Sequence, residues 1–202
     1  MLFYTMFITI VLLFTTGINF VYVSKNNFYV WDMLLNILYA ILICAIIMSA
    51  IAILVRIMPK KYFNPNRLRY KCPKFEEKIY KKLKVHKWKG IVPDGGRTGG
   101  FKKKNLVDPR NEKYMHRFLF ENCLAETVHT LSIILSFLIL ILIPHRYLLT
   151  IALPIFLTFV ILNFLPILVL RSIRPKLLKV YNHLVQVEEE KQEDDDTELV
   201  NV

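Results

Sequence analysis

The sequence from Met33 to Val55, MLLNILYAILICAIIMSAIAILV, is 23 residues long and contains no charged side chain. A helix of about 20 apolar residues crosses the hydrocarbon core of a bilayer, which is roughly 30 Å thick. In that core every backbone N–H and C=O group must be bonded internally, and a helix meets this requirement. The stretch therefore predicts a transmembrane helix, and it sets the fold class of the chain.

Three further stretches share this character and contain no Asp, Glu, Lys or Arg: Leu2–Val23, Thr127–Ile143 and Tyr147–Leu170. The first lacks the basic start and the cleavage site of a signal peptide, so we expect it to be retained. The third is the shortest, at 17 residues. The sequence thus predicts an all-α membrane protein with about four transmembrane helices. They form two hairpins, one in residues 1–57 and one in residues 117–170, where an amphipathic helix leads into the second hairpin.

Charge is concentrated between these hairpins. The 202 residues have a net charge of +11, and residues 58–126 hold 19 basic and 7 acidic residues. The hairpin turns contain little basic charge, chiefly Lys25 and Arg146. Basic loops stay on the cytoplasmic side, so we expect a multi-pass protein of the cell membrane with both termini in the cytoplasm. Because this rule accounts for the basic excess and no nucleic-acid module is visible, we predict no nucleic-acid partner.

The regions outside the apolar stretches differ in composition. Residues 58–116 contain five of the nine prolines and most of the glycines, which predicts a basic, irregular cytoplasmic segment on the membrane surface. Residues 171–187 read as an interfacial basic helix that Pro175 interrupts or restarts. The acidic run in residues 188–202 is typical of a disordered tail.

Several basic and aromatic residues of the cytoplasmic side are candidates for substrate binding. Lys87, Trp88 and Lys89 either anchor the segment at the interface or bind a phosphate and stack on a sugar. Arg171 and Arg174 follow the last apolar stretch and either anchor it or clamp a phosphate or carboxylate.

The Gly-rich stretch after these residues also allows two interpretations. Asp94 lies in Pro-Asp-Gly-Gly, which is a tight turn or a means of aiming a carboxylate. Arg97 lies in Gly95–Gly100, a flexible basic loop or a phosphate cradle. The loop lacks the Gly-Lys-Ser/Thr ending of a nucleotide-binding P-loop.

The helix that leads into the third apolar stretch carries the candidate catalytic residues. On a helix, Asn122, Glu126 and His129 fall within a sector of about 60°, with Glu121 beside it. Ionisable groups at the membrane face protein or water. Glu126 is three residues before His129, so its carboxylate can orient an imidazole that takes a proton from a substrate hydroxyl. We predict His129, Glu126, Glu121 and Asp94 as catalytic.

Two other interpretations of this helix remain open. Headgroups and loop lysines could satisfy its polar residues. Glu-x-x-His could also bind a metal, but a di-iron bundle needs a second such motif and further glutamates, which the other helices lack. We therefore predict no metal site and no bound cofactor.

Taken together, these motifs resemble one family, the glycosyl-4,4′-diaponeurosporenoate acyltransferases of carotenoid synthesis. The resemblance covers roughly residues 55–180 and is most specific at Lys87-Trp-Lys89 with Asp94-Gly95, and at Glu121, Ala125-Glu126 and His129. It also includes Arg174 and Pro175. It implies a membrane enzyme that esterifies a sugar hydroxyl of a glycosyl carotenoid with a fatty acyl group.

Two functions follow as hypotheses. The first is an acyltransferase in which His129 and Glu126 act as general base, with an acyl-CoA or an acyl carrier protein as donor and a glycosylated lipid or carotenoid as acceptor. The second is a non-enzymatic membrane scaffold or lipid-binding protein. In both cases membrane lipids are partners, and the sequence leaves the oligomeric state open.

Overall fold

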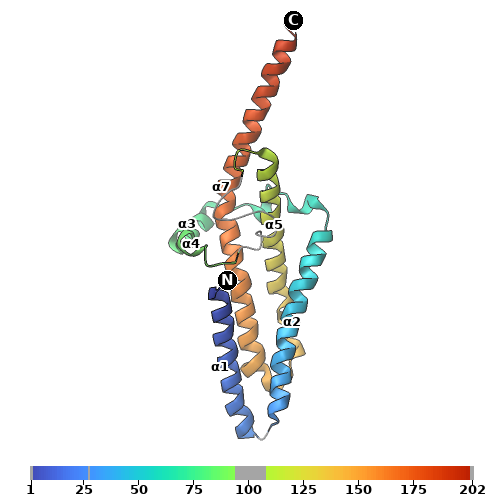
Figure 1. Cartoon of the computed structure of the whole chain (residues 1–202), viewed down its shortest axis with the longest axis vertical. Helices are drawn as coiled ribbons and strands as arrows, with labels where there is room; N and C mark the ends of the chain where they lie inside the picture. Colours follow the sequence, from blue (N-terminus) through green and yellow to red (C-terminus); the bar gives the residue numbers. More distant parts are fainter. Residues whose placement is uncertain (1, 27, 94–107, 201–202) are drawn as a thin grey trace. The chain divides into compact units, whose positions relative to one another are not determined.

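The structure, a computed structural model, describes residues 2–26, 28–93 and 108–200, and for residues 191–200 it describes the backbone alone. The described residues form helices and no strand, which confirms the all-α class (Figure 1). The elements are α1 (Leu2–Asn26), α2 (Val30–Ile57), η1 (Lys60–Phe63), η2 (Leu68–Tyr70), α3 (Lys74–Lys82), α4 (Val85–Trp88), α5 (Glu112–Leu135), α6 (Phe137–Leu142), η4 (His145–Tyr147), the π-helical turn η5 (Leu148–Ala152) and α7 (Leu153–Val200).

Four helical stretches are long and apolar enough to cross a membrane, as the sequence predicted: Leu2–Asn26, Val30–Ile57, Glu112–Leu142 and His145–Glu190. The third is longer than the 17 apolar residues expected, because α5 begins well before them. The Asn111 side chain caps this helix by accepting a hydrogen bond from the Tyr114 N–H at 3.1 Å. Ser136 separates α5 from α6, and its hydroxyl donates to the Ile133 carbonyl.

The chain divides into two compact units. Unit 1 comprises Met1–Pro59, Ile91–Pro93 and Glu126–Leu168, and unit 2 comprises Lys60–Gly90, Asp94–Ala125 and Val169–Val202. The basic segment therefore shares a unit with the first half of α5 and the second half of α7. Each unit is described separately below.

Unit 1 is built on the hairpin of α1 and α2 (Figure 1). The helix α6 packs against α2, and the turn η5 packs against both α1 and α2. One face of α2 is buried, at Ala40, Ile47 and Val55 among others. At the hairpin turns, the Asp32 carboxylate accepts hydrogen bonds from the Arg146 guanidinium and, at 3.0 Å, from the Tyr147 hydroxyl. This cluster joins the turn between α1 and α2 to the turn before α7.

Unit 2 has a core between α5 and α7, centred on Met115, Phe118, Leu119 and Leu177. The sequence predicts the basic segment, residues 58–116, as an irregular stretch on the membrane surface. The structure shows that the segment contributes to a shared core, because Phe63 packs on Phe120 of α5 and Tyr70 is fully buried. A stretch of about 60 residues is marginally stable alone, and burial against neighbouring helices supplies the missing apolar area.

The helix α7 continues through its prolines, so the expected interruption at Pro175 is wrong. Proline lacks an N–H and leaves a carbonyl four residues earlier without its helical donor. In unit 1, α1 supplies donors to two such carbonyls. Asn19 Nδ2 donates to the Thr150 carbonyl at 2.7 Å, opposite Pro154, and the Tyr4 hydroxyl donates to the Leu162 carbonyl at 3.4 Å, opposite Pro166.

Candidate functional site

The polar face of α5 supplies two of the predicted catalytic residues to unit 1. Glu126 is buried and His129 is half-buried, one helical turn further along. The Glu126 carbonyl also accepts a hydrogen bond from the Thr130 hydroxyl. The sequence prediction that Glu126 and His129 turn towards the interior and away from lipid therefore agrees with their burial.

His129 has a partner that sequence analysis missed. Its Nδ1 lies 2.9 Å from Oδ1 of Asn163, a residue of α7 that is 4% exposed. Asn163 Nδ2 donates to the Phe159 carbonyl at 2.8 Å, so Oδ1 is the atom that faces the imidazole. Because Oδ1 can only accept, the proton of a neutral imidazole resides on Nδ1, and Nε2 carries the lone pair. This tautomer is the one that a general base acting through Nε2 requires.

The sequence does distinguish Asn163 from its neighbours. It is the one Asn, Gln or charged residue in Tyr147–Leu170. Such groups are costly within a bilayer and mark functional or packing contacts. The sequence could not identify its partner, because His129 is 34 residues away on a different helix.

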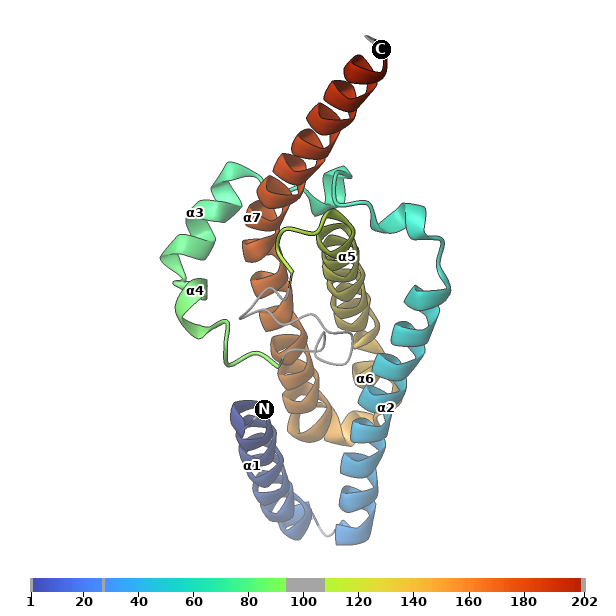
Figure 2. The same ribbon diagram turned by 45° about the horizontal axis from the view of Figure 1, so that its top comes forward.

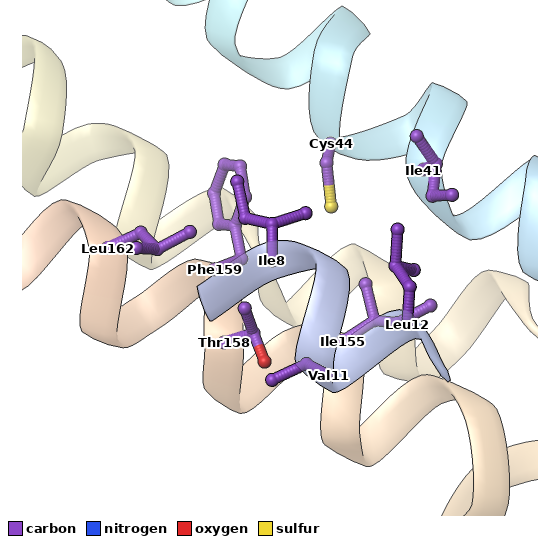
Figure 3. A pocket seen from close by; sticks show the side chains of 9 residues that line it. All are labelled: Ile8, Val11, Leu12, Ile41, Cys44, Ile155, Thr158, Phe159 and Leu162. Atoms are coloured by element: carbon purple, nitrogen blue, oxygen red, sulfur yellow. The ribbon is translucent and has the colours of Figure 1, made fainter. Parts of the chain in front are cut away.

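Besides this pair, unit 1 contains an apolar cleft of about 180 Å³ between α1, α2 and α7 (Figure 3). Phe159 belongs to both features, since its ring lines the cleft and its carbonyl holds Asn163. The polar atoms that its lining side chains carry are the Cys44 thiol and the Thr158 hydroxyl. The walls come from α1, α2 and α7: Ile8, Val11, Leu12, Ile41, Cys44, Ile155, Thr158, Phe159 and Leu162.

Two of the predicted substrate-binding arginines, Arg171 and Arg174, lie in unit 2 and are bonded within the chain. Arg171 makes two hydrogen bonds to the Glu76 carboxylate, at 2.8 and 2.9 Å. Arg174 is 1% exposed and donates to Asn122 Oδ1 at 2.7 Å and to the Tyr70 carbonyl at 2.9 Å. These contacts fasten α3 and the turn after η2 to α7, which is a structural role.

These contacts change the pKa of the Glu76 carboxyl. Its partial burial alone would raise its pKa, but the hydrogen bonds from Arg171 and Tyr80 outweigh that effect and hold the pKa below its ordinary value. Glu76 therefore stays ionised in the paired state.

Glu121, the third predicted catalytic residue, lines a different cleft, of about 650 Å³, in unit 2. Cationic and aromatic residues share its walls, among them Lys60, Lys61 and Tyr181. Asp94 and Arg97 lie outside the described residues, so their predicted roles stay predictions.

The Lys87-Trp-Lys89 motif falls on and just after the short helix α4. Trp88 Nε1 donates to the Leu83 carbonyl at 3.0 Å, which leaves the indole face as the part able to stack on a ligand. Lys87 is exposed, whereas Lys89 lines a cleft beside α7. Among the described residues, no group of three or more His, Cys, Asp or Glu side chains comes together as metal ligands would.

Comparison with known proteins adds one match. The model of the glycosyl-4,4′-diaponeurosporenoate acyltransferase family matches residues 59–183, which includes α3, α4, α5 and most of α7. No curated protein sequence matches the chain, and no solved structure matches it. The family match covers more than half of the 202 residues and includes Glu126, His129 and Asn163. The chain belongs to the glycosyl-4,4′-diaponeurosporenoate acyltransferase family.

Proposed function

We propose that this protein is an integral-membrane O-acyltransferase. It moves a fatty acyl group from a thioester donor to a sugar hydroxyl of a glycosylated carotenoid or related glycolipid. Family membership and four helices able to cross a membrane support the reaction class. The observation that carries the chemistry is the Asn163–His129 hydrogen bond, which sets the imidazole tautomer.

In the proposed reaction, His129 Nε2 takes the proton of the sugar hydroxyl as its oxygen attacks the acyl carbonyl. The new C–O ester bond forms, the C–S bond of the thioester breaks, and the proton passes from the imidazolium to the leaving thiolate. Asn163 Oδ1 holds Nδ1–H throughout. The buried Glu126 carboxylate, one helical turn away, favours the transient imidazolium. Positioned general bases of this kind contribute about 10²- to 10⁴-fold to rate.

The apolar cleft of Figure 3 suits the hydrocarbon part of a membrane-dissolved substrate. Its lining is almost entirely apolar, so a hydrocarbon chain can enter it from the bilayer without burying polar groups.

The test is acylation by variants of the full chain, measured by mass spectrometry of extracted glycolipids. We expect His129→Ala to reduce the acylated product by about 10²-fold or more. Asn163→Leu, which removes the Nδ1 acceptor, should also reduce it, whereas Asn163→Asp should keep part of the activity because it retains an acceptor.

The Asn163→Asp variant has a second readout that a purely structural role would not alter. A carboxylate at this position favours the protonated imidazole, so the acidic limb of the pH–rate profile should move to higher pH. Undiminished acylation by well-folded His129→Ala would remove His129 from the mechanism. If no variant changed any lipid product, a non-enzymatic scaffold would be the better account.

A further inference from the structure

Unit 2 contains a second cleft, of about 350 Å³, lined by residues of α3 and α4 and by residues of α7. This volume is at the lower end of the range for small-molecule sites. Figure 2 shows the ribbons of these three helices. The cleft is distinct from the one that Glu121 lines and from the apolar cleft of unit 1. Its lining includes Tyr80, Val85 and Pro175, and most of its charged groups are lysines.

The charge of this cleft is strongly positive. Lys81 and Lys89 reach it from the α3–α4 side, Lys176 and Lys179 reach it from α7, and one acid, Glu77, accompanies them. In the part of the chain whose side chains are described, no ion pair involves any of these four lysines. The nearby Arg171 and Arg174, by contrast, are bonded to protein acceptors. The four lysines thus bring like charges together with one acid among them, an arrangement that an anionic ligand would stabilise.

The walls of the cleft are held in place independently of any ligand. Arg171 joins α7 to Glu76 of α3 through its two hydrogen bonds, and the Tyr80 hydroxyl donates to the same carboxylate at 2.7 Å. Arg174 adds a bond from α7 to the Tyr70 carbonyl. A preformed site loses less conformational entropy when it binds its ligand.

We propose that this cleft binds the phosphate groups of a nucleotide-linked acyl donor of the coenzyme A type. Lysine ammonium groups bind phosphates as point charges, and several of them around one cleft suit a carrier with more than one phosphate. This inference rests on the proposed function, because it identifies where the donor of that reaction is held. It assigns donor binding to Lys81, Lys89, Lys176 and Lys179, of which the sequence predicted Lys89 alone.

The experiment measures binding of coenzyme A, without an acyl group, to the purified full chain in a neutral detergent. The test variant is Lys81→Gln with Lys179→Gln, which removes one charge from each wall. The matched control is Lys74→Gln with Lys78→Gln, which removes the same charge from exposed positions of α3 outside the cleft. We expect the test variant to weaken binding by about tenfold or more, since hydrogen bonds to charged groups are strong. The control should change it by less than about twofold.

Two further arms identify the ligand. Dephospho-coenzyme A, which lacks the 3′-phosphate, should bind wild type more weakly than coenzyme A does. The difference in affinity between wild type and the test variant should also be smaller with this ligand. Flotation with phosphatidylglycerol and phosphatidylcholine vesicles examines lipid phosphate as the source. If coenzyme A does not bind, but anionic vesicles bind in a way that depends on Lys81 and Lys179, the donor assignment is overturned in favour of a headgroup site. Equal losses in the test and control variants would overturn it as well.

The binding experiment and the acylation test of the proposed function can fail independently of each other. His129 lies in unit 1, and we expect His129→Ala to bind coenzyme A as wild type does while failing to acylate. If the lysine variant loses coenzyme A binding but acylates at the wild-type rate when the donor is saturating, the assignment of this cleft to donor binding is supported. Intact acylation by His129→Ala would contradict the reaction mechanism and leave the binding result standing.

Discussion

Arg174 was predicted to bind substrate, but its observed contacts are those of a residue that holds the fold together. Its place after the last apolar stretch suggested an anchor or an anion clamp, and the family resemblance includes it. The structure buries it with Asn122 Oδ1 and the Tyr70 carbonyl as acceptors. Its guanidinium also lies over the Tyr70 ring, 5.2 Å from the centroid. A buried arginine with these contacts fixes neighbouring segments.

We expect Arg174→Ala to destabilise the protein by about 2–5 kcal/mol, because it leaves two buried acceptors unpaired. Thermal unfolding of the full chain in detergent measures the change. Arg110→Ala, which removes the same charge from an exposed position, should have little effect. If Arg174 instead bound substrate directly, the KM of the Arg174→Ala variant would rise while its unfolding midpoint stayed at the wild-type value.

For individual residues, the sequence predicted which side chains share a helix face but not which residues they contact. Helical spacing predicted that Asn122, Glu126 and His129 share a face, and all three are buried or half-buried. The spacing could not assign Asn122 to Arg174 and His129 to Asn163, since those partners come from α7. Periodicity within one helix contains no information on which helix packs against it.

At the scale of elements, the fastening of α3 to α7 depends on pH through Glu76. Its lowered folded pKa means that the ionised carboxylate stabilises the native state. This contribution is complete above the ordinary carboxyl pKa of about 4.5 and is lost as the pH falls through the lower folded value. Because the group is partly exposed, solvent screening limits its size.

We therefore expect wild type to be more stable than Glu76→Gln at neutral pH, and the two unfolding midpoints to converge as the pH drops below about 4.5. Glu77→Gln, at the adjacent position of the same helix, should show a smaller difference. A gap between wild type and Glu76→Gln that is unchanged down to pH 3 would contradict an ionic role for this bond.

Helices were easier to predict than their interruptions. Uncharged stretches of 17 to 24 residues gave all four membrane-length helices. The rule that proline interrupts a helix failed for α7. At Pro154 and Pro166 the structure shows why the helix tolerates proline, because Asn19 and Tyr4 of α1 donate to the freed carbonyls. Compensation of this kind is a tertiary effect and is invisible to a local rule.

At the scale of the whole molecule, the charge distribution predicts orientation in the membrane. We expect the basic segment and both termini on the cytoplasmic side and the two hairpin turns outside. Single cysteines in a background with Cys44, Cys72 and Cys123 replaced by serine can test this. Lys25→Cys in intact cells should react with a membrane-impermeant maleimide, whereas Lys74→Cys should react after the membrane is permeabilised. The reverse pattern would contradict the prediction.

The contact between Asp32 and Arg146 has a consequence for how the chain assembles. Each hairpin can insert into a bilayer by itself, but the two side chains can meet only if both turns reach the same side of it. A chain with one hairpin inserted the wrong way would leave Asp32 and Arg146 separated by the full thickness of the membrane, each without its partner. The ion pair can therefore form only in molecules whose two hairpin turns have reached the same side of the bilayer.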